Sequence, residues 1–465
     1  MLDARQITLR FLETKLQVHP DVVRYIQEQD NLDLVDRIIE NVPDHTIVVS
    51  AKHIPGMNVT RDGMRFLTDP TVEIVSGSPG TSGCVNGTAD YLYYFRDRFS
   101  RLGNMIRNRC GPIPIEALTR SPRYRQEECT VIGMVTEVKA TKNDHRIAEL
   151  EDLSANISVL FRKDRPIFED AKRLIPDEVI GVKGKLSNDG RLFFADQMYR
   201  PDIRVDNTPF KSETPGKAVF ISDVHVGSNT FLEECWNRFA DWLADSGASY
   251  LLIAGDLVDG IGIFPGQEQE LTIKNIYEQY DVFGEMISKL PHRIKIIVSP
   301  GNHDVVRGAE PQPVIPEAFT KKFPENCVLV ENPALVNLQG VRVLMYHGRS
   351  IDDMIGLIPG ASYDQSGLMM QEMLQRRHLA PAYGRRTPIA AGKIDRLIID
   401  PIPEILHTGH VHIRGLTQYR GVLGINAGTW QSQTAFQKQM NVNPTPAQAV
   451  MVDLQTLVPE TFTFL

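Results

Sequence analysis

The chain has 465 residues, of which 42% are hydrophobic and 23% charged, and its formal net charge at pH 7 is −8. This length predicts two or three domains, because a single hydrophobic core rarely grows beyond about 250–300 residues. The composition is ordinary for a soluble protein. The negative charge counts mildly against a nucleic-acid binder, although local basic clusters, or cations held by carboxylates, would offset it.

The sequence contains no apolar run of about 20 residues, which a membrane-spanning helix requires. Its first residues mix charges throughout and lack the apolar core of a signal peptide. We therefore expect a cytoplasmic protein with no membrane partner. The five cysteines are scattered without close pairs, which argues against both a zinc ribbon and a disulfide framework.

Residues 1–42 are expected to form a helical domain, since apolar residues recur at helical spacing and Pro20 separates two such runs. A small helical bundle and a module that docks a partner protein are equally good interpretations. Residues 43–90 include a stretch rich in glycine, serine, threonine and proline, which is typical of a linker.

Residues 91–210 are expected to form a second domain with a basic leading segment. Arginines far outnumber acids in this segment, and tyrosines and a phenylalanine lie beside them. This combination suits a surface that follows a nucleic-acid backbone, although a helix face paired with acidic neighbours is slightly favoured. The candidate DNA-binding residues are Arg96, Arg98, Arg101, Arg107 and Arg109.

From about residue 127 to residue 200 the apolar pattern becomes that of strands. We expect four strands, at 129–141, 157–163, 178–187 and 191–200. Short strands at this spacing, with glycines at candidate bends, predict a small β-barrel of the OB type. Such barrels either bind single-stranded nucleic acid or dock proteins, and composition does not separate the two.

Residues 211–465 are expected to form an α/β domain, because strands alternate with segments long enough for crossover helices. Polar motifs follow directly on the apolar strands, where sheets of this class place their functional sites. The motifs are Asp223-Val224-His225, Gly255-Asp256, Gly301-Asn302-His303-Asp304, His347-Gly348 and Gly409-His410-Val411-His412.

This set of side chains points to the hydrolysis of a phosphodiester. That reaction needs hydroxide and neutralised phosphate oxygens, and two cations about 3.5–4 Å apart supply both. Mixed aspartate, histidine and asparagine ligands suit Mn²⁺ first, or Fe or Zn²⁺, better than Mg²⁺. Each motif alone is a weak signal, because a lone buried histidine is usually a core residue. All five motifs in order at strand ends predict a site with two divalent ions.

The order of motifs resembles the calcineurin-like metallophosphoesterase superfamily. The resemblance implies a metallophosphoesterase sandwich with three ligands on each of two metals and one bridging carboxylate. The first metal would be held by Asp223, His225 and His412, the second by Asn302, His347 and His410, and the bridge would be Asp256. The resemblance also implies that His303 donates a proton to the leaving oxygen or stabilises the transition state, and that Asp304 orients His303. No motif position is substituted, so nothing points to a dead site.

A barrel of the OB type ahead of a phosphoesterase is similar to the small subunits of replicative DNA polymerases. The stretches 376–390, 407–415 and 425–449 resemble the small subunit of the archaeal D-family DNA polymerase. In that family the small subunit is the 3′→5′ proofreading exonuclease and the large subunit synthesises DNA. The resemblance therefore implies a large polymerase subunit as partner and DNA with single-stranded or mismatched 3′ ends as substrate. The sliding clamp is a further candidate partner.

Two other functions stay open at this point. A phosphomonoesterase acting on proteins or small molecules would carry the same metal motifs, but the arginine-rich segment, the barrel and the C-terminal stretches favour DNA. A scaffold subunit with a vestigial site is disfavoured by the intact set of candidate ligands.

Overall fold

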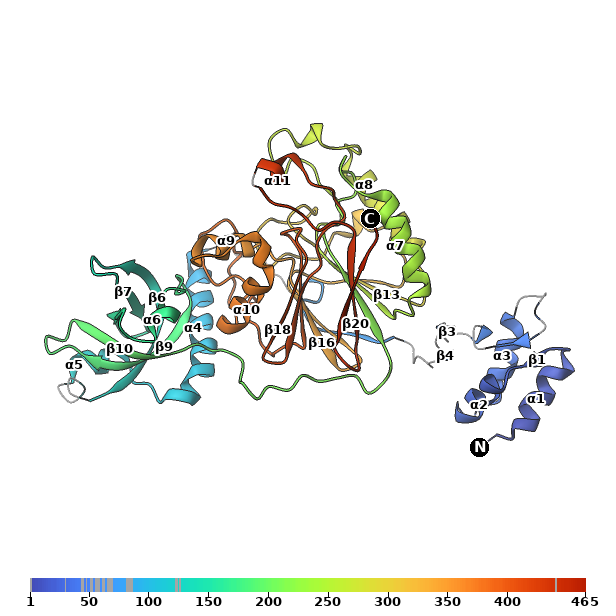
Figure 1. Ribbon diagram of the computed structural model, residues 1–465, viewed down its shortest axis with the longest axis horizontal. Coiled ribbons are helices and arrows are strands. Elements are labelled where there is room, and N and C mark those ends of the chain that lie inside the picture. Colours follow the sequence, from blue (N-terminus) through green and yellow to red (C-terminus); the bar gives the residue numbers. More distant parts are fainter. Residues whose placement is uncertain are drawn as a thin grey trace.

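The computed structural model describes residues 2–29, 31–42, 46, 48–50, 53–54, 59–60, 63–64, 70–80, 87–121, 124, 127–439 and 441–465. The chain forms an N-terminal group of helices, a barrel with a long helix, and a sandwich of two sheets (Figure 1). Within these residues, no helix has both the length and the apolar character that crossing a membrane would demand.

The N-terminal part has its own small core. It consists of α1 (Ala4–Glu13), α2 (Pro20–Gln29) and α3 (Asp33–Asn41), with a parallel pair formed by β1 (Gln17–Val18) and β2 (Val48–Val49). The Asp3 side chain accepts a hydrogen bond from Arg5 N and so caps α1. Pro20 opens α2, where its missing N–H is not needed. The helices therefore break at Pro20, as the apolar periodicity indicated.

The stretch 43–90 is more than the linker we expected. It contains β3 (Val59–Thr60), β4 (Gly63–Met64) and β5 (Val72–Ser76). β5 pairs antiparallel with β15 (Ala334–Leu338) and so adds an edge strand to one sheet of the sandwich. Val72 and Ile74 alternate with the polar Thr71 and Glu73, a strand signal that the composition of the following glycine-rich stretch concealed. Residues 81–86 of that stretch lie outside the described residues.

The second part is a closed five-stranded barrel with strand order β10-β8-β7-β6-β9. Its elements are β6 (Cys129–Ala140), β7 (Arg146–Glu151), β8 (Asn156–Phe161), α6 (Phe168–Ala171), β9 (Val179–Leu186) and β10 (Leu192–Tyr199), preceded by α4 (Thr88–Cys110) and α5 (Ile115–Arg120). The four expected strands are present, but β7 was missed. Only Ala148 and Leu150 of β7 are fully buried, so its apolar signal is weak.

The third part is a sandwich of two six-stranded sheets with strand orders β14-β13-β12-β11-β20-β21 and β18-β19-β17-β16-β15-β5. The strands of the first sheet are β11 (Lys217–Ile221), β12 (Tyr250–Ala254), β13 (Lys295–Ser299), β14 (Cys327–Leu329), β20 (Gln448–Asp453) and β21 (Pro459–Thr463). The second sheet adds β16 (Val341–Met345), β17 (Ile405–Thr408), β18 (Gly415–Tyr419) and β19 (Val422–Asn426).

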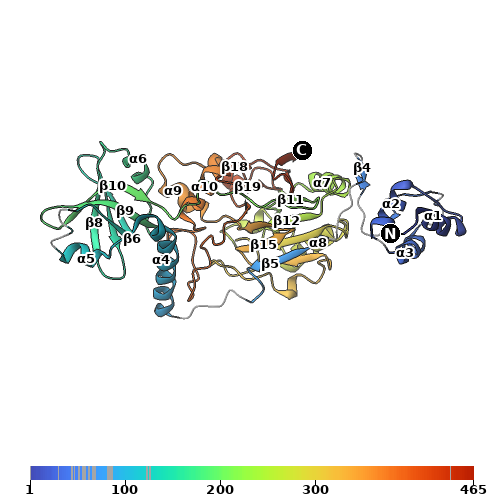
Figure 2. The same ribbon diagram turned by 90° about the horizontal axis from the view of Figure 1, so that it is seen from below.

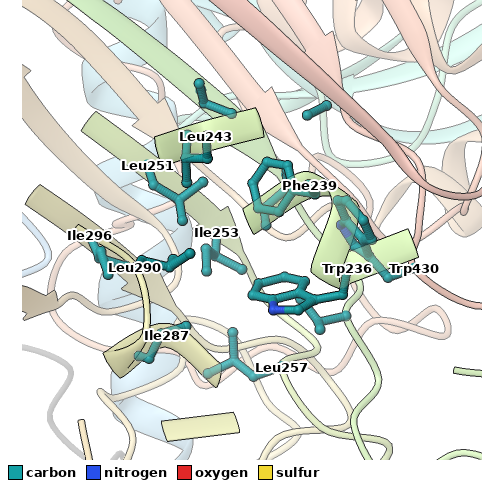
Figure 3. Packing of buried hydrophobic residues seen from close by; sticks show 14 of the residues in the cluster. Trp236, Phe239, Leu243, Leu251, Ile253, Leu257, Ile287, Leu290, Ile296 and Trp430 are labelled. Atoms are coloured by element: carbon teal, nitrogen blue, oxygen red, sulfur yellow. The ribbon is translucent and has the colours of Figure 1, made fainter. Parts of the chain in front are cut away.

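Helices cover both outer faces of the sandwich. α7 (Glu233–Asp245) and α8 (Ile276–Ser288) pack on the first sheet, and α9 (Ile351–Leu357) and α10 (Ser366–Arg376) pack on the second. Figure 3 shows Trp236 and Phe239 of α7 against Leu251 and Ile253 of β12. Alternate residues of the same strands face the other sheet, so these strands are apolar on both sides.

The shorter elements of the sandwich are η3 (Gln267–Gln269), η4 (Glu317–Phe319), η5 (Tyr363–Gln365) and α11 (Ala435–Gln439). Strands β11 to β14 run parallel to one another, as do β16, β17 and β19. Their carboxyl ends therefore bring the polar motifs to one end of the sandwich.

Helix α4 lies between the barrel and the sandwich (Figure 2) and joins them through buried polar contacts. Arg98 is fully buried: its Nε donates to Asp395 Oδ2 at 2.7 Å, its Nη1 to Pro381 O at 2.7 Å and its Nη2 to Tyr94 Oη at 2.6 Å. The prediction that Arg98 binds DNA is therefore wrong, because no solvent or ligand reaches its guanidinium.

Two further candidate DNA-binding arginines also bond within the chain. Arg101 donates to Asp395 O at 3.0 Å, and Arg109 donates to Asp202 O at 2.6 Å. Arg101 also pairs with Asp97 and Asp400, which assigns its side chain to the joint between barrel and sandwich. Arg109 is exposed despite its bond to Asp202, so DNA binding by Arg109 stays a prediction. Arg96 and Arg107 are exposed, and for them DNA binding stays a prediction.

Candidate metal centre

The motif residues begin a few positions beyond the strands that carry them. Asp223, Asp256, His347 and His410 each stand two residues after the end of β11, β12, β16 and β17, and Asn302 stands three residues after β13. The two sheets are packed face to face, so these loops meet above the shared core. This explains why motif residues as far apart in the chain as Asp223 and His412, 189 positions, form one site.

The backbone at this site is strained at the candidate ligands. Five of them have a positive φ between 51° and 72°, namely Asp223, His225, Asp256, His410 and His412. Each left-handed non-glycine residue costs on the order of 1–3 kcal/mol and persists only where the surrounding structure enforces it. Strain concentrated on these positions indicates that the fold holds their side chains in place for a purpose other than stability.

Two motif glycines are there because the backbone approaches the carboxylates closely. A Cβ at position Gly301 would lie 2.2 Å from Asp256 Oδ1, and one at position Gly409 would lie 2.4 Å from Asp223 Oδ2. Neither position can carry a side chain without moving an aspartate. The glycines of the third and fifth motifs therefore serve the geometry of the site directly.

Asp223, His225 and His412 form a first group. His412 Nε2 lies 3.4 Å from Asp223 Oδ1 and 3.1 Å from His225 Nε2, and His225 Nε2 lies 3.9 Å from Asp223 Oδ1. Their ligand atoms are all within 4.8 Å of one another. Two imidazole nitrogens and a carboxylate oxygen converging in this way are a suitable donor set for one divalent cation.

A second group lies beside the first. His347 Nε2 is 3.0 Å from Asn302 Oδ1 and 3.3 Å from Asp256 Oδ2, and His410 completes a cluster with Asp256 and His347. Asp256 Oδ2 is also 3.8 Å from His225 Nε2, which belongs to the first group. The structure thus brings all seven predicted ligands together and places Asp256 between the two groups.

Other side chains and a carbonyl hold the far nitrogen of each histidine. His225 Nδ1 lies 3.2 Å from Asp259 Oδ1, His347 Nδ1 lies 2.9 Å from Ala254 O, and His412 Nδ1 lies 2.8 Å from the amide of Gln437. His410 uses its Nε2 instead, 3.3 Å from Asp352 Oδ2. Where an acceptor holds Nδ1, as at His225 and His347, the contact orients the imidazole and leaves Nε2 for the ion.

The sequence alone did not identify the residues that make these outer contacts. Asp259 had a weak signal, because it follows Asp256 by three residues in the same loop. Asp352, on α9, had none, and Gln437, on α11, had only its place in the stretch 425–449.

His303 lies at the edge of the two groups, and its backbone N donates to Asp256 Oδ1 at 2.8 Å. Its Nδ1 lies 2.7 Å from Asp259 O, so the proton on Nδ1 is donated to that carbonyl and Nε2 is left free. The ring packs edge-on to His225 with centroids 4.8 Å apart. His303 also lines the cavity at the site.

Asp304 does not orient His303, so that expectation is wrong. Its Oδ2 accepts from Gly301 N at 2.8 Å and Leu257 N at 3.3 Å, and its Oδ1 accepts from Tyr280 Oη at 2.7 Å. Burial, with the nearby charge of Asp256, raises the pKa of Asp304 to about 7. Asp304 instead ties the third motif to the loop after β12, and the carbonyl of Asp259 holds His303.

The two central carboxylates are ionised although they are buried. Burial raises the pKa of Asp256, but the charges of His347, His303 and His225 outweigh it and hold the pKa well below its usual value. Burial also raises the pKa of Asp223, but its contact with His412 lowers the pKa by more, so that it lies below its usual value. Asp256 in turn raises the pKa of His347 to about 10, against the effect of burial.

These charges fit a site for divalent cations. Among the described residues, neither Asp223 nor Asp256 pairs with a lysine or an arginine, and their partners are imidazoles. A buried carboxylate needs a counter-charge. A cation at each group would supply it and displace the proton from His347, since a bound ion requires neutral imidazole.

The groups open into a cavity of about 320 Å³. Its lining includes His225, Asp256, His303, His410 and His412, together with side chains from other loops of the sandwich. Both carboxylate and imidazole atoms therefore face a space that a substrate can enter.

Comparisons with known proteins agree with the motif resemblance. The family of DNA polymerase alpha/epsilon B subunits matches residues 218–414, which contain all five motifs. The chain is 43% identical to the DNA polymerase II small subunit of Methanothermobacter thermautotrophicus, over 82% of this chain and 81% of that protein. The corresponding protein of Archaeoglobus fulgidus is 42% identical over 82% of this chain and 78% of its own length.

A solved archaeal phosphodiesterase is also similar, with 12% identity and a TM-score of 0.28, over 53% of this chain and 98% of that one. At more than 40% identity over about four fifths of both chains, this chain belongs to the family of archaeal DNA polymerase II small subunits, the D-family small subunits.

Proposed function

We propose that this chain is the small subunit of a replicative DNA polymerase and carries a two-metal 3′→5′ exonuclease that proofreads DNA. Its sandwich is then a calcineurin-like metallophosphoesterase domain, its barrel is of the OB type, and a large catalytic subunit is its partner. The name shared by its relatives supports the polymerase complex. The geometry of the site supports the nuclease.

The observation that carries the proposal is the position of Asp256. Its Oδ2 lies 3.3 Å from His347 Nε2 and 3.8 Å from His225 Nε2, so one carboxylate serves both groups of ligands. The first cation would be held by Asp223, His225 and His412, and the second by Asn302, His347 and His410. When bound, two such ions generate hydroxide at neutral pH and neutralise the phosphate oxygens.

The chain supplies the remaining groups. Attack of a water oxygen on phosphorus breaks the bond to the 3′ oxygen of the preceding nucleotide, releasing a 5′-mononucleotide and a strand one nucleotide shorter. The leaving 3′ oxygen must take up a proton. His303 would donate it from Nε2 in its imidazolium form, because its Nδ1–H is held by Asp259 O and Nε2 is left for the substrate. The ring then becomes neutral and takes up its next proton from solvent.

The metal preference follows from the donor set. Four of the seven proposed ligands are imidazoles, which suit Mn²⁺ better than Mg²⁺. We expect activity to require a divalent cation and to be higher with Mn²⁺. Full activity in Mg²⁺ buffer that elemental analysis shows to be free of transition metals would contradict this assignment.

The test uses end-labelled DNA with the full chain, alone and together with the large subunit. We expect nucleotides to be lost from the 3′ end, faster from single strands and mismatched termini than from paired ones, because unpairing costs on the order of 1–2 kcal/mol per step. Digestion from the 5′ end, or equal rates on paired and frayed 3′ ends, would refute the proposal. Hydrolysis of p-nitrophenyl phosphate without cleavage of DNA would favour a phosphomonoesterase, and no hydrolysis in the complex would favour a scaffold.

A further inference from the structure

The cavity at the metal centre has walls that the ligands do not account for. Phe264 comes from the loop after β12, and Tyr363 and Arg386 come from segments near α9. Arg386 lies in the stretch 376–390, and Gln431 and Gln437 lie in the stretch 425–449. The volume of about 320 Å³ falls in the range of about 300–1,000 Å³ typical of small-ligand sites.

Phe264 is an exposed aromatic residue on a firmly held loop. Buried Gln267 accepts from Ile263 N at 2.9 Å through its Oε1, and its Nε2 donates to Asp259 O at 2.8 Å. Gln279 Oε1 accepts from Gly260 N at 2.9 Å. The loop is thus fixed to the Asp259 that orients His225 and His303, while Phe264 keeps 38% of its surface exposed.

Arg386 is fixed in a similar way. Asp353 accepts from Arg386 N at 2.8 Å and from Thr387 N at 3.0 Å. Tyr363 lies beside both Arg386 and Asp352, and Asp352 Oδ2 lies 3.3 Å from His410 Nε2. The guanidinium is therefore linked to a candidate metal ligand through two side chains, yet the residue is exposed to solvent.

We propose that Phe264 and Arg386 form a subsite for the 3′-terminal nucleotide, in which Phe264 stacks on the base and Arg386 binds an adjacent backbone phosphate. This inference rests on the proposed nuclease function. Stacking on an aromatic ring accepts every base, because each has a π-face. The planar guanidinium matches a phosphate through two parallel hydrogen bonds.

The subsite gives a physical reason for preferring frayed ends. A base reaches Phe264 inside the cavity only after it has left its partner strand. Mismatched termini meet this condition at lower cost than paired ones. Selection would therefore depend on whether the end is unpaired and not on which base it carries, as a proofreading activity requires.

The test of Phe264 compares two single strands that differ only at the 3′ end, one with a normal terminal nucleotide and one with an abasic terminal sugar. The wild type should cleave the normal end with a kcat/KM about 10- to 100-fold higher, the usual value of stacking one base. Phe264→Ala should lose this difference, and Phe264→Tyr should keep it. Ile261→Ala is the matched control, because Ile261 is 45% exposed on the same loop but does not line the cavity.

Arg386 is tested separately. Arg386→Gln should raise KM for DNA about 10-fold with little change in kcat, and should keep the preference for a normal terminus because Phe264 is intact. Arg385→Gln, at an exposed neighbouring position outside the cavity, should behave as the wild type. Equal KM values for Arg386→Gln and Arg385→Gln would remove Arg386 from the subsite.

The two proposals fail in different ways. A wild type that cleaves normal and abasic ends equally well overturns the subsite and leaves the nuclease intact. A wild type that cleaves neither end in the complex overturns the nuclease. The subsite is then decided by binding of the same two strands in Ca²⁺, where equal affinities overturn it. If Phe264→Ala keeps the base preference but no longer binds the large subunit, the loop is a docking surface and the subsite is wrong.

Discussion

The metal centre and the joint at α4 are both built from buried charged residues, but they differ in how the charge is neutralised. At the joint, Asp395 lies 2.7 Å from Arg98 Nε and 2.8 Å from His378 Nε2, and all three side chains are buried. At the metal centre, the partners of Asp223 and Asp256 are the imidazoles of the other candidate ligands. Within the described residues they have no lysine or arginine partner.

The backbone shows the same contrast. Arg98 lies in the middle of a regular helix, whereas Asp223 and Asp256 have left-handed backbone conformations. A buried ion pair whose two partners both belong to the chain is neutralised internally and needs no ion from outside. Carboxylates with a strained backbone and no positively charged partner carry negative charge that a bound cation can neutralise. The difference separates charges that serve docking of the barrel from charges that serve chemistry.

The largest expected effect comes from Asp256→Asn, which keeps the shape of the side chain and removes its charge. Because this carboxylate is proposed to contact both cations, hydroxide formation and phosphate binding should fail together. We expect nuclease activity to fall by several orders of magnitude and the metal content to drop. Exonuclease rate, elemental analysis and assembly with the large subunit would be measured together.

The matched control for Asp256→Asn is Asp395→Asn, the same substitution at the joint. Removing one partner of a buried pair costs about 3–5 kcal/mol, so this variant should unfold more easily. It should still bind metal and cleave DNA under conditions where it is folded. Near-normal exonuclease activity of Asp256→Asn would show that the two-metal assignment is wrong.

His303→Ala should have a smaller effect of a different kind. His303 is proposed to act on the substrate and not on metal, so the variant should keep its ions and lose about 10²–10⁴-fold in rate. The same measurements of rate and metal content distinguish the two variants. If His303→Ala loses its metal in a folded protein, His303 is a ligand and not a proton donor.

The parts of the fold that could be predicted are those where local pattern and tertiary structure agree. β11, β12, β13 and β16 are buried on both faces, so each is a continuous apolar run that ends abruptly at a motif. We did not predict β7 and β5, because only one face or few residues of each strand are buried. A strand at an edge or in a small barrel leaves a weaker trace in the sequence than a central one.

The wrong predictions for single residues share one physical cause. The hydrogen-bond partners of a side chain are its neighbours in the folded structure, which are often distant in the sequence. Arg98 finds Asp395, which is 297 positions away in the chain, so its exposure could not be judged from neighbouring residues. Asp304 is adjacent to His303 in sequence, yet its carboxylate turns to Tyr280 and two backbone N–H groups. No sequence motif marked Asp352, because its role depends only on its contact with His410.

The smallest expected effect concerns acid and the joint at α4. His378 is held neutral: Ala380 N donates to its Nδ1 at 3.0 Å, so the proton lies on Nε2 and is donated to Asp395. Burial, with the charge of Arg98, lowers the pKa of His378 to about 4, against the opposing charge of Asp395. Burial raises the pKa of Asp395, but His378 and Arg98 hold it far below its usual value, so this carboxylate stays ionised in mild acid.

As the pH falls from about 6.5 towards 4, His378 becomes protonated in the unfolded chain but stays neutral in the folded chain. The contribution of neutral His378 to the free energy of unfolding is therefore present above pH 6.5 and is lost below it. Between pH 7 and pH 5 the loss should be about 2 kcal/mol. The free energy of unfolding would be measured against pH for the wild type and His378→Gln, which should start less stable but show a flatter slope. His292→Gln, at an exposed position, should keep the wild-type slope. Because the pKa of His407 is also lowered by burial, to about 3, the variant should flatten the acid response without abolishing it. Parallel curves for wild type and His378→Gln would mean that His378 takes up its proton in the folded joint, and that the joint tolerates a second positive charge beside Arg98.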